Sequence, residues 1–93
     1  MAKELTIFYM EGCPYCRNAR KAVQELQEAN ADYASVPLHW IDETKESALA
    51  DEYPYYRVPS VFIGKTKLYE CDPSEKYRDI RDQMEKVMIA ALA

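Results

Sequence analysis

The 93-residue sequence has no apolar run that approaches the ~18 residues needed to cross a bilayer. The segment before the first apolar run, residues 1–4, is short and polar, and it contains neither the hydrophobic segment nor the cleavage site of a secretory signal. There is no basic cluster, and the net charge of -4 argues against nucleic acid as a partner. Repeats, linkers and low-complexity stretches are also lacking. These absences predict a single cytoplasmic domain over residues 1-93, monomeric, that binds neither membrane nor nucleic acid.

Cysteine is scarce, with three residues in the chain. In a cytosolic protein, reducing conditions disfavour a framework of structural disulfides, so three cysteines indicate a redox or metal role. A structural zinc site needs four ligands, and Cys71 and His39 are not paired at zinc spacing with the other two cysteines. We therefore predict redox chemistry and no metal.

The most informative motif is Cys13-Pro14-Tyr15-Cys16, which follows the apolar run Leu5–Tyr9 and opens a stretch with helical periodicity. Pro14 suits the first position of a helix, where its missing N–H costs nothing. The free N–H groups and the dipole of a helix N-terminus favour a thiolate over a thiol. Because the thiolate is the attacking species in disulfide exchange, the motif predicts a redox pair with one exposed and one buried thiol.

Hydrophobic periodicity and turn residues predict an α/β fold with the order β-α-β-α-β-β-α. The predicted elements are strand 4–9, helix 14–30, strand 33–41, helix 42–51, strand 58–63, strand 66–69 and a last helix that opens at 72–75. Pro37 cannot donate to a ladder, which places the second strand at a sheet edge or gives it an irregular start. Asp42 and Asp72 are predicted N-caps of the last two helices. A strand–helix–strand start implies a parallel crossover, and the hairpin makes the sheet mixed.

This order resembles the glutaredoxin family of the thioredoxin fold, because Cys-Pro-Tyr-Cys follows the first strand and Val58-Pro59 precedes the third. The resemblance implies a four-stranded mixed sheet flanked by three helices. It also implies a cis bond before Pro59, which would lie against the two cysteines and present the Val58 backbone to a thiol-bearing ligand. Cys13 would be the nucleophile and Cys16 the resolving thiol.

The family reaction is the reduction of protein disulfides and glutathione mixed disulfides, with glutathione as co-substrate and no bound cofactor. The implied partners are glutathione and proteins that carry a disulfide or a glutathione adduct. Tyr15 is expected to shape access to Cys13.

Three positions depart from the family pattern. The basic residue expected three positions before the first cysteine is Met10, the threonine before Val-Pro is Arg57, and the Gly-Gly pair is Tyr69-Glu70. Arg57 is either a solvated residue or a replacement cation for a glutathione carboxylate. Cys71 and Asp72 match the family, and the Asp72 carboxylate could bind the γ-glutamyl ammonium. Cys71 is interpreted as a small, partly buried residue rather than a reactive thiol. Tyr69-Glu70 would add bulk and negative charge beside that spot.

Two other functions stay open at this point. One is a glutaredoxin-like electron donor that thioredoxin reductase recharges, which the loss of the Gly-Gly pair and of the upstream cation favours. The other is a non-catalytic module that binds an iron–sulfur cluster. The sequence also leaves open whether selenocysteine occupies position 13 in the natural form.

Overall fold

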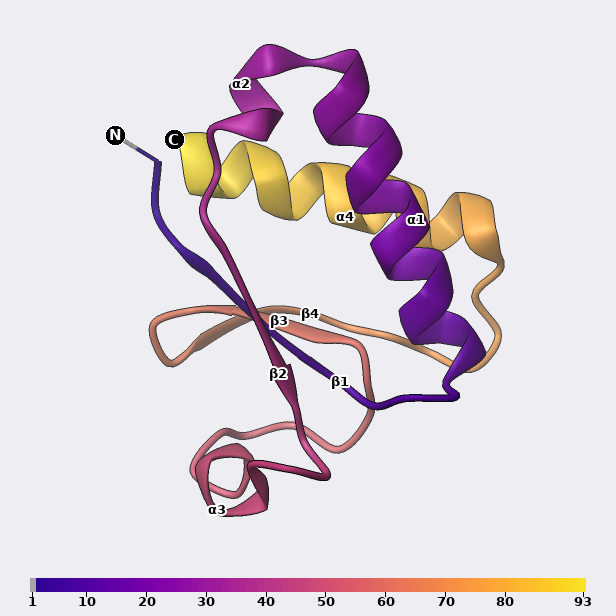
Figure 1. Cartoon of the computed structure of the whole chain (residues 1–93), viewed down its shortest axis with the longest axis vertical. Helices are drawn as coiled ribbons and strands as arrows, with labels where there is room; N and C mark the ends of the chain where they lie inside the picture. The colour runs from indigo at the N-terminus through magenta and orange to yellow at the C-terminus, as the bar shows by residue number, and fades with distance from the viewer. Residues whose placement is uncertain (1) are drawn as a thin grey trace.

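The computed structural model describes residues 2–93, which form four strands and four helices (Figure 1). In chain order they are β1 (Leu5–Tyr9), α1 (Pro14–Ala29), α2 (Ala31–Ala34), β2 (Leu38–Asp42), α3 (Ser47–Ala50), β3 (Ser60–Ile63), β4 (Thr66–Glu70) and α4 (Tyr77–Leu92). The two chain ends lie together, since the Lys3 N–H donates to the Ala91 carbonyl at 2.8 Å.

The strands form one mixed sheet in the order β2-β1-β3-β4. β1 pairs with β2 in parallel and with β3 antiparallel, and β3 pairs antiparallel with β4. Gly64 turns the β3–β4 hairpin with a φ of 57°, a conformation that glycine adopts at little cost. The mixed sheet and the edge position of β2 are confirmed.

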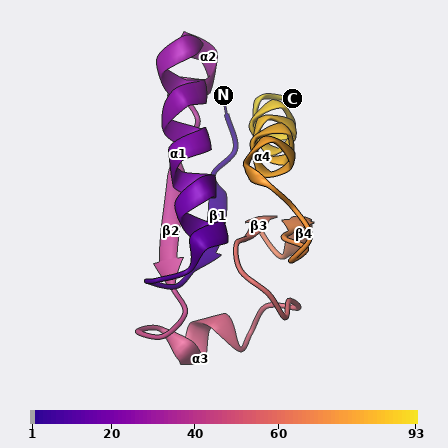
Figure 2. The ribbon, with the colours of Figure 1, turned by 90° about the vertical axis from the view of Figure 1, so that its right-hand side faces the viewer.

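Alternating side chains of the strands build a core on each face of the sheet. Leu5 and Ile7 pack with the buried faces of α1 and α4, whereas Phe8 packs with Phe62 and α3 residue Ala50 on the other face. Figure 2 shows α1 and α4 side by side, with α3 well apart from both. The helix that begins at the Cys-Pro-Tyr-Cys motif is therefore anchored by the larger of the two cores.

The predicted second strand begins too early, because residues 31–34 form the short helix α2. The Asn30 side chain caps this helix by accepting from the Asp32 N–H at 2.9 Å. Tyr33 is buried against α1 and α4, and its hydroxyl donates to Glu85 at 2.8 Å. Tertiary burial of one aromatic ring thus outweighs its strand propensity. The sheet is flanked by four helices rather than three.

Asp42 and Asp72, the two predicted helix N-caps, close local turns and do not begin helices. Asp42 Oδ1 accepts from the Thr44 N–H at 2.9 Å, and α3 begins only at Ser47. Asp72 Oδ1 accepts from the Ser74 N–H at 2.8 Å, while α4 begins at Tyr77. Short acidic side chains compete with helix formation by closing local turns of this kind. A turn over residues 72–75 therefore leads from β4 to α4.

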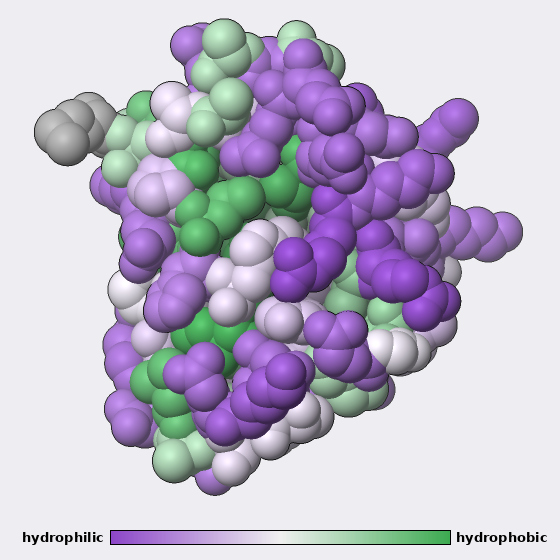
Figure 3. Space-filling model, viewed as in Figure 1, coloured by the Kyte–Doolittle hydropathy of each residue, from purple (hydrophilic) through white to green (hydrophobic). Residues whose placement is uncertain are grey.

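Hydrophilic side chains predominate on the face that carries α1 and β2, and hydrophobic ones show through between them (Figure 3). In residues 2–93, no helix combines the length and the apolar character that a membrane crossing requires.

Candidate active site around Cys13 and Cys16

The loop after β1 places Cys13 at the start of α1. Gly12 has a φ of 79°, which turns the chain so that Cys13 becomes the N-cap residue and Pro14 begins the helix. Cys13 Sγ accepts a hydrogen bond from the Cys16 N–H at 3.3 Å. The sulfur thus occupies the position where a capping oxygen usually accepts from the first turn.

Both thiols of the motif are buried, which corrects the prediction that one is exposed. Cys13 is 5% and Cys16 is 2% exposed, and both are free thiols. The loop before β3 covers Cys13, and the Val58 carbonyl oxygen in this loop lies 4.0 Å from Cys13 Sγ. Burial, with the Cys13 side chain as a further cause, raises the pKa of Cys16 to about 12. Cys16 therefore stays protonated at neutral pH.

The loop that covers Cys13 contains a cis peptide bond between Val58 and Pro59, as predicted. Pro59 is fully buried, and its carbonyl accepts from the Cys71 N–H at 3.0 Å. The chain on either side of this bond thus contacts both the motif and the residue that follows β4.

A pocket of about 290 Å³ opens above Cys13. Its wall contains five of the residues singled out from the sequence, namely Cys13, Tyr15, Arg57, Val58 and Cys71, together with Met10, Glu43, Tyr56 and Pro73. Three other predicted residues lie off the wall. Cys16 is buried in the first turn of α1, Pro59 is fully buried, and the exposed Asp72 lies between wall residues Cys71 and Pro73.

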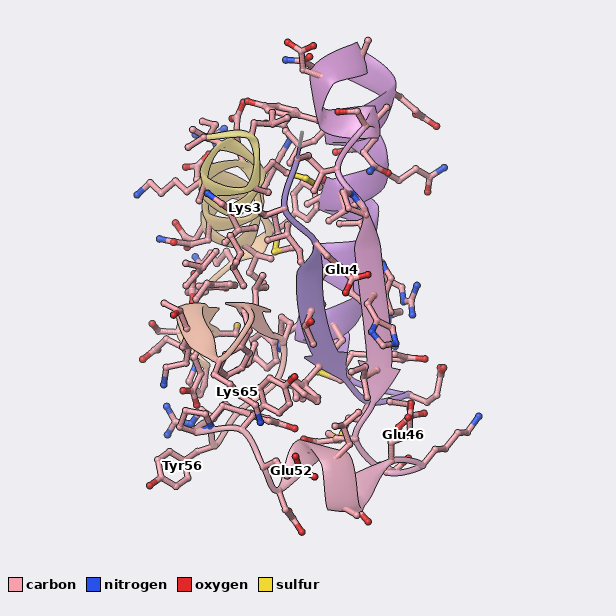
Figure 4. All side chains as sticks on the ribbon, turned by 90° about the vertical axis from the view of Figure 1, so that its left-hand side faces the viewer. Lys3, Glu4, Glu46, Glu52, Tyr56 and Lys65 are labelled. Carbon is pink, nitrogen blue, oxygen red and sulfur yellow. The ribbon has the colours of Figure 1, made fainter. Side chains whose placement is uncertain are left out.

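Tyr15 and Tyr56 bound the pocket in different ways. The Tyr15 hydroxyl donates to the Pro73 carbonyl at 2.9 Å, which ties the start of α1 to the turn after β4. Tyr56 is 96% exposed and projects away from the molecule (Figure 4). One side of the pocket is therefore fixed, and the other has an aromatic ring available to a ligand.

The two residues that replace the expected glycines do not enter the pocket. Tyr69 is buried, and its hydroxyl donates to Glu75 at 3.1 Å. Glu70 Oε2 accepts from the backbone N–H groups of Tyr56 and Arg57 at 2.9 and 2.7 Å. Its other oxygen accepts from Lys67 Nζ at 2.7 Å. Added bulk and free negative charge at the pocket, expected from the sequence, are thus absent at these two residues.

Glu70 fixes the loop that covers Cys13. Burial, the largest single influence, raises the pKa of this carboxyl, but the hydrogen bonds from Lys67 and from the two backbone N–H groups together outweigh it and lower the pKa. The carboxylate is therefore stabilised in the geometry that holds the segment before Val58.

Asp72 and Cys71 have different environments. Hydrogen bonds from Ser74 lower the pKa of Asp72, and the positive charge of Arg57 adds to this effect. Burial is the main cause that raises the pKa of Cys71, whose Sγ lies 3.5 Å from the Asp72 carbonyl oxygen. Arg57 thus attracts the Asp72 carboxylate, although the two form no ion pair among residues 2–93.

Glu43 is a wall residue that the sequence reasoning missed. Because β1 and β2 are parallel and Tyr9 pairs with Asp42, the next residues, Met10 and Glu43, leave the sheet at the same edge. Glu43 Oε1 accepts from the Tyr55 hydroxyl at 2.7 Å. Burial and then this hydrogen bond raise the pKa of Tyr55. The signal available in the sequence was the acidic residue directly after a strand parallel to the one that leads to Cys13.

Within the described part of the chain, no three histidine, cysteine, aspartate or glutamate side chains gather in a way that could hold a metal ion.

The sheet order, the helices and the motif at the start of α1 define a thioredoxin-like fold. This chain is similar to thioredoxin 1 from Thermosipho africanus TCF52B, with a TM-score of 0.59 and 12% identity. The match covers 97% of this chain and 99% of that chain. A mutant thioredoxin from Halobacterium salinarum NRC-1 gives a TM-score of 0.57 at 24% identity, covering 89% of this chain and 72% of that chain. A malarial protein gives a TM-score of 0.62 at 19% identity, and the match covers 92% of this chain and 97% of that chain.

The sequence model of the glutathione S-transferase N-terminal domain matches residues 7–77. The chain belongs to this family. No curated protein matches it. Fold and family are consistent with a thiol–disulfide oxidoreductase, and the resemblance to glutaredoxins stays a prediction.

Proposed function

We propose that this protein is a dithiol glutaredoxin-type oxidoreductase, which reduces protein disulfides and glutathione mixed disulfides with glutathione as co-substrate. The observation that carries the proposal is the position of Cys13 Sγ, which is in the wall of the pocket and accepts the Cys16 N–H at 3.3 Å. A sulfur at a helix N-terminus that receives a backbone donor is suited to act as the attacking thiolate.

In the first step, the Cys13 thiolate attacks one sulfur of the substrate disulfide. A Cys13–substrate disulfide forms, the original S–S bond breaks, and the leaving thiolate takes a proton from water. The Cys16 sulfur then attacks Cys13 Sγ, the Cys13–substrate bond breaks, and the proton of Cys16 passes to the departing substrate sulfur. A Cys13–Cys16 disulfide remains. The substrate gains two electrons and the dithiol loses two. Two glutathione molecules restore the dithiol and leave as glutathione disulfide.

The pocket offers groups for each part of an extended ligand. The backbone of Val58 lies beside Cys13 Sγ and can pair with the ligand main chain in the manner of an added strand. Arg57 supplies a guanidinium for a carboxylate, and Asp72 supplies a carboxylate for an ammonium at the β4 side. Tyr15 and Cys71 complete the wall between these groups.

Burial of the Cys16 thiol supports its assignment as the resolving group. Its raised pKa of about 12 keeps it protonated at rest, so only Cys13 competes for the incoming disulfide. Cys16 becomes reactive only when a mixed disulfide on Cys13 brings a target sulfur within reach.

The test is turnover of a small glutathione mixed disulfide with glutathione reductase and NADPH as the coupled readout. We expect activity that rises with glutathione, is abolished in Cys13→Ser and survives in Cys16→Ser, because a second glutathione can resolve the adduct. An inactive Cys16→Ser variant would contradict this mechanism.

A second candidate is an electron donor with the same dithiol chemistry that a flavoprotein thioredoxin reductase recharges. The observation that favours it is the Glu43 carboxylate in the wall of the pocket, since negative charge there opposes an anionic peptide such as glutathione. Reduction of the disulfide form by reductase and NADPH, unaffected by glutathione, would support this candidate over the first.

A further inference from the structure

The pocket above Cys13 is flanked by charged side chains that follow the two outer strands of the sheet. Glu43 follows β2 and Asp72 follows β4, which are the two outer strands of the sheet. Three strand spacings separate them, roughly 14 Å. The positive charge of Arg57, a residue of the pocket wall, acts on Asp72, so the β4 end has a cation as well as an anion. The β2 end holds Glu43.

Glu43 has no cation beside it in the described part of the chain. The ion pairs among residues 2–93 join Lys65 to Glu52, Lys67 to Glu70 and Arg81 to Glu25. The side-chain hydrogen bond of Glu43 comes from the neutral Tyr55 hydroxyl, which occupies Oε1 and orients the carboxylate. The Glu43 carboxylate is therefore half-buried, held in position by a neutral donor and not part of an ion pair.

The rim of the pocket is suited to a polypeptide. Met10 and Tyr56 on its wall are 38% and 96% exposed, which leaves apolar surface for a partner. A volume of about 290 Å³ is at the small end for ligand pockets and accommodates the disulfide with a neighbouring side chain.

We propose that Glu43 makes this pocket selective for disulfides whose cysteine has a basic residue as its neighbour. This inference rests on the proposed oxidoreductase function and specifies its substrate class. A lysine or arginine next to the cysteine places its cation at the β2 end, where it gains attraction to Glu43, whereas an acidic neighbour is repelled. The chemistry at the sulfurs is unchanged: one peptide disulfide becomes two peptide thiols, and the dithiol becomes the Cys13–Cys16 disulfide.

The experiment uses symmetrical peptide disulfides that differ only in the residues beside the single cysteine, which are lysine, glutamine or glutamate. The pre-reduced protein reacts with each peptide in a single turnover, so the measured rate does not depend on which reductant recharges the protein. Each rate is divided by the rate with dithiothreitol, because neighbouring charges also alter the intrinsic reactivity of a disulfide. A charge pair in a partly solvated groove is worth about 1 kcal/mol, and we expect about a fivefold change in rate for each step from lysine to glutamine to glutamate.

The key variant is Glu43→Gln, which keeps an oxygen for the Tyr55 hydroxyl and removes the charge. We expect its three corrected rates to converge, and the preference of the wild type to weaken with added salt. Glu46→Gln is the matched control, because Glu46 is exposed, lies off the pocket wall and carries the same charge. It should keep the full preference.

Equal corrected rates in the wild type, or the same preference in Glu43→Gln as in the wild type, would overturn the inference and leave the proposed function standing. If the wild type reduces none of the peptides, the proposed function fails and the inference falls with it. Reversal of the preference in Glu43→Lys would support it further.

Discussion

Glu70 links β4 to the loop that covers Cys13, and its removal should destabilise both. Glu70→Ala deletes two backbone hydrogen bonds, from Tyr56 and Arg57, and the contact with Lys67. A hydrogen bond to a charged group contributes about 1.5–3 kcal/mol when water cannot replace it. Because Tyr56 and Arg57 are exposed, water can hydrogen-bond to their N–H groups in the variant and offset part of the lost free energy. We expect a total loss of about 1–3 kcal/mol in the free energy of unfolding.

The assay is thermal and urea unfolding of the wild type, Glu70→Ala, Glu70→Gln and Lys67→Ala. For a domain of this size, each kcal/mol lowers Tm by roughly 4–8 °C. Lys67→Ala removes only a partly exposed ion pair, and should cost about 0.2–1 kcal/mol. Glu70→Gln keeps an acceptor for the loop and should fall between these two variants.

The pH dependence gives an independent check. The pKa of Glu70 is lowered in the folded state, so its contribution is present above the unfolded pKa of about 4.3 and is lost as pH falls through the folded value. The difference in stability between the wild type and Glu70→Gln should therefore shrink in acid. A Glu70→Ala variant no less stable than Lys67→Ala would refute the assignment of Glu70 as the anchor of the loop.

Two further predictions concern the cysteines. In Cys13→Ser, alkylation of Cys16 by iodoacetamide in the folded protein should be slow at pH 8, because burial, the main cause that raises the pKa of this thiol, remains and the thiolate is the reactive form; rapid modification at neutral pH, measured by mass spectrometry, would contradict the burial of this thiol. Cys71→Ser should leave turnover of a glutathione mixed disulfide unchanged, because Cys71 is assigned to packing at the pocket wall, and loss of turnover together with a Cys13–Cys71 disulfide in the wild type would show a redox role instead.

Much of the fold could be predicted because local and global signals agree. The apolar, β-favouring run Leu5–Tyr9 and the helical period after Pro14 correspond to β1 and α1, and Pro37 precedes the edge strand β2, as expected. The errors lie where one side chain makes a tertiary or local contact that the hydrophobic pattern does not show. Tyr33 is drawn into the core between α1 and α4, and the carboxylates of Asp42 and Asp72 close turns.

The candidate site could be predicted in part for similar reasons. The motif identified the start of α1, and the position of Val58-Pro59 identified the loop over it. The role of Glu70 could not be read from the sequence, because its partners are backbone groups 13 and 14 residues earlier. Glu43 could be found only by combining the parallel pairing of β1 and β2 with the residue that follows β2.

The central claim is that Cys13 is the nucleophile, and the most direct test is to trap its adduct. Cys16→Ser is incubated with glutathione disulfide, and the modified peptide is identified by mass spectrometry. We expect a single glutathione on Cys13, formed faster than on any other cysteine and released by added glutathione. An unmodified Cys13, or glutathione on Cys71 instead, would contradict it.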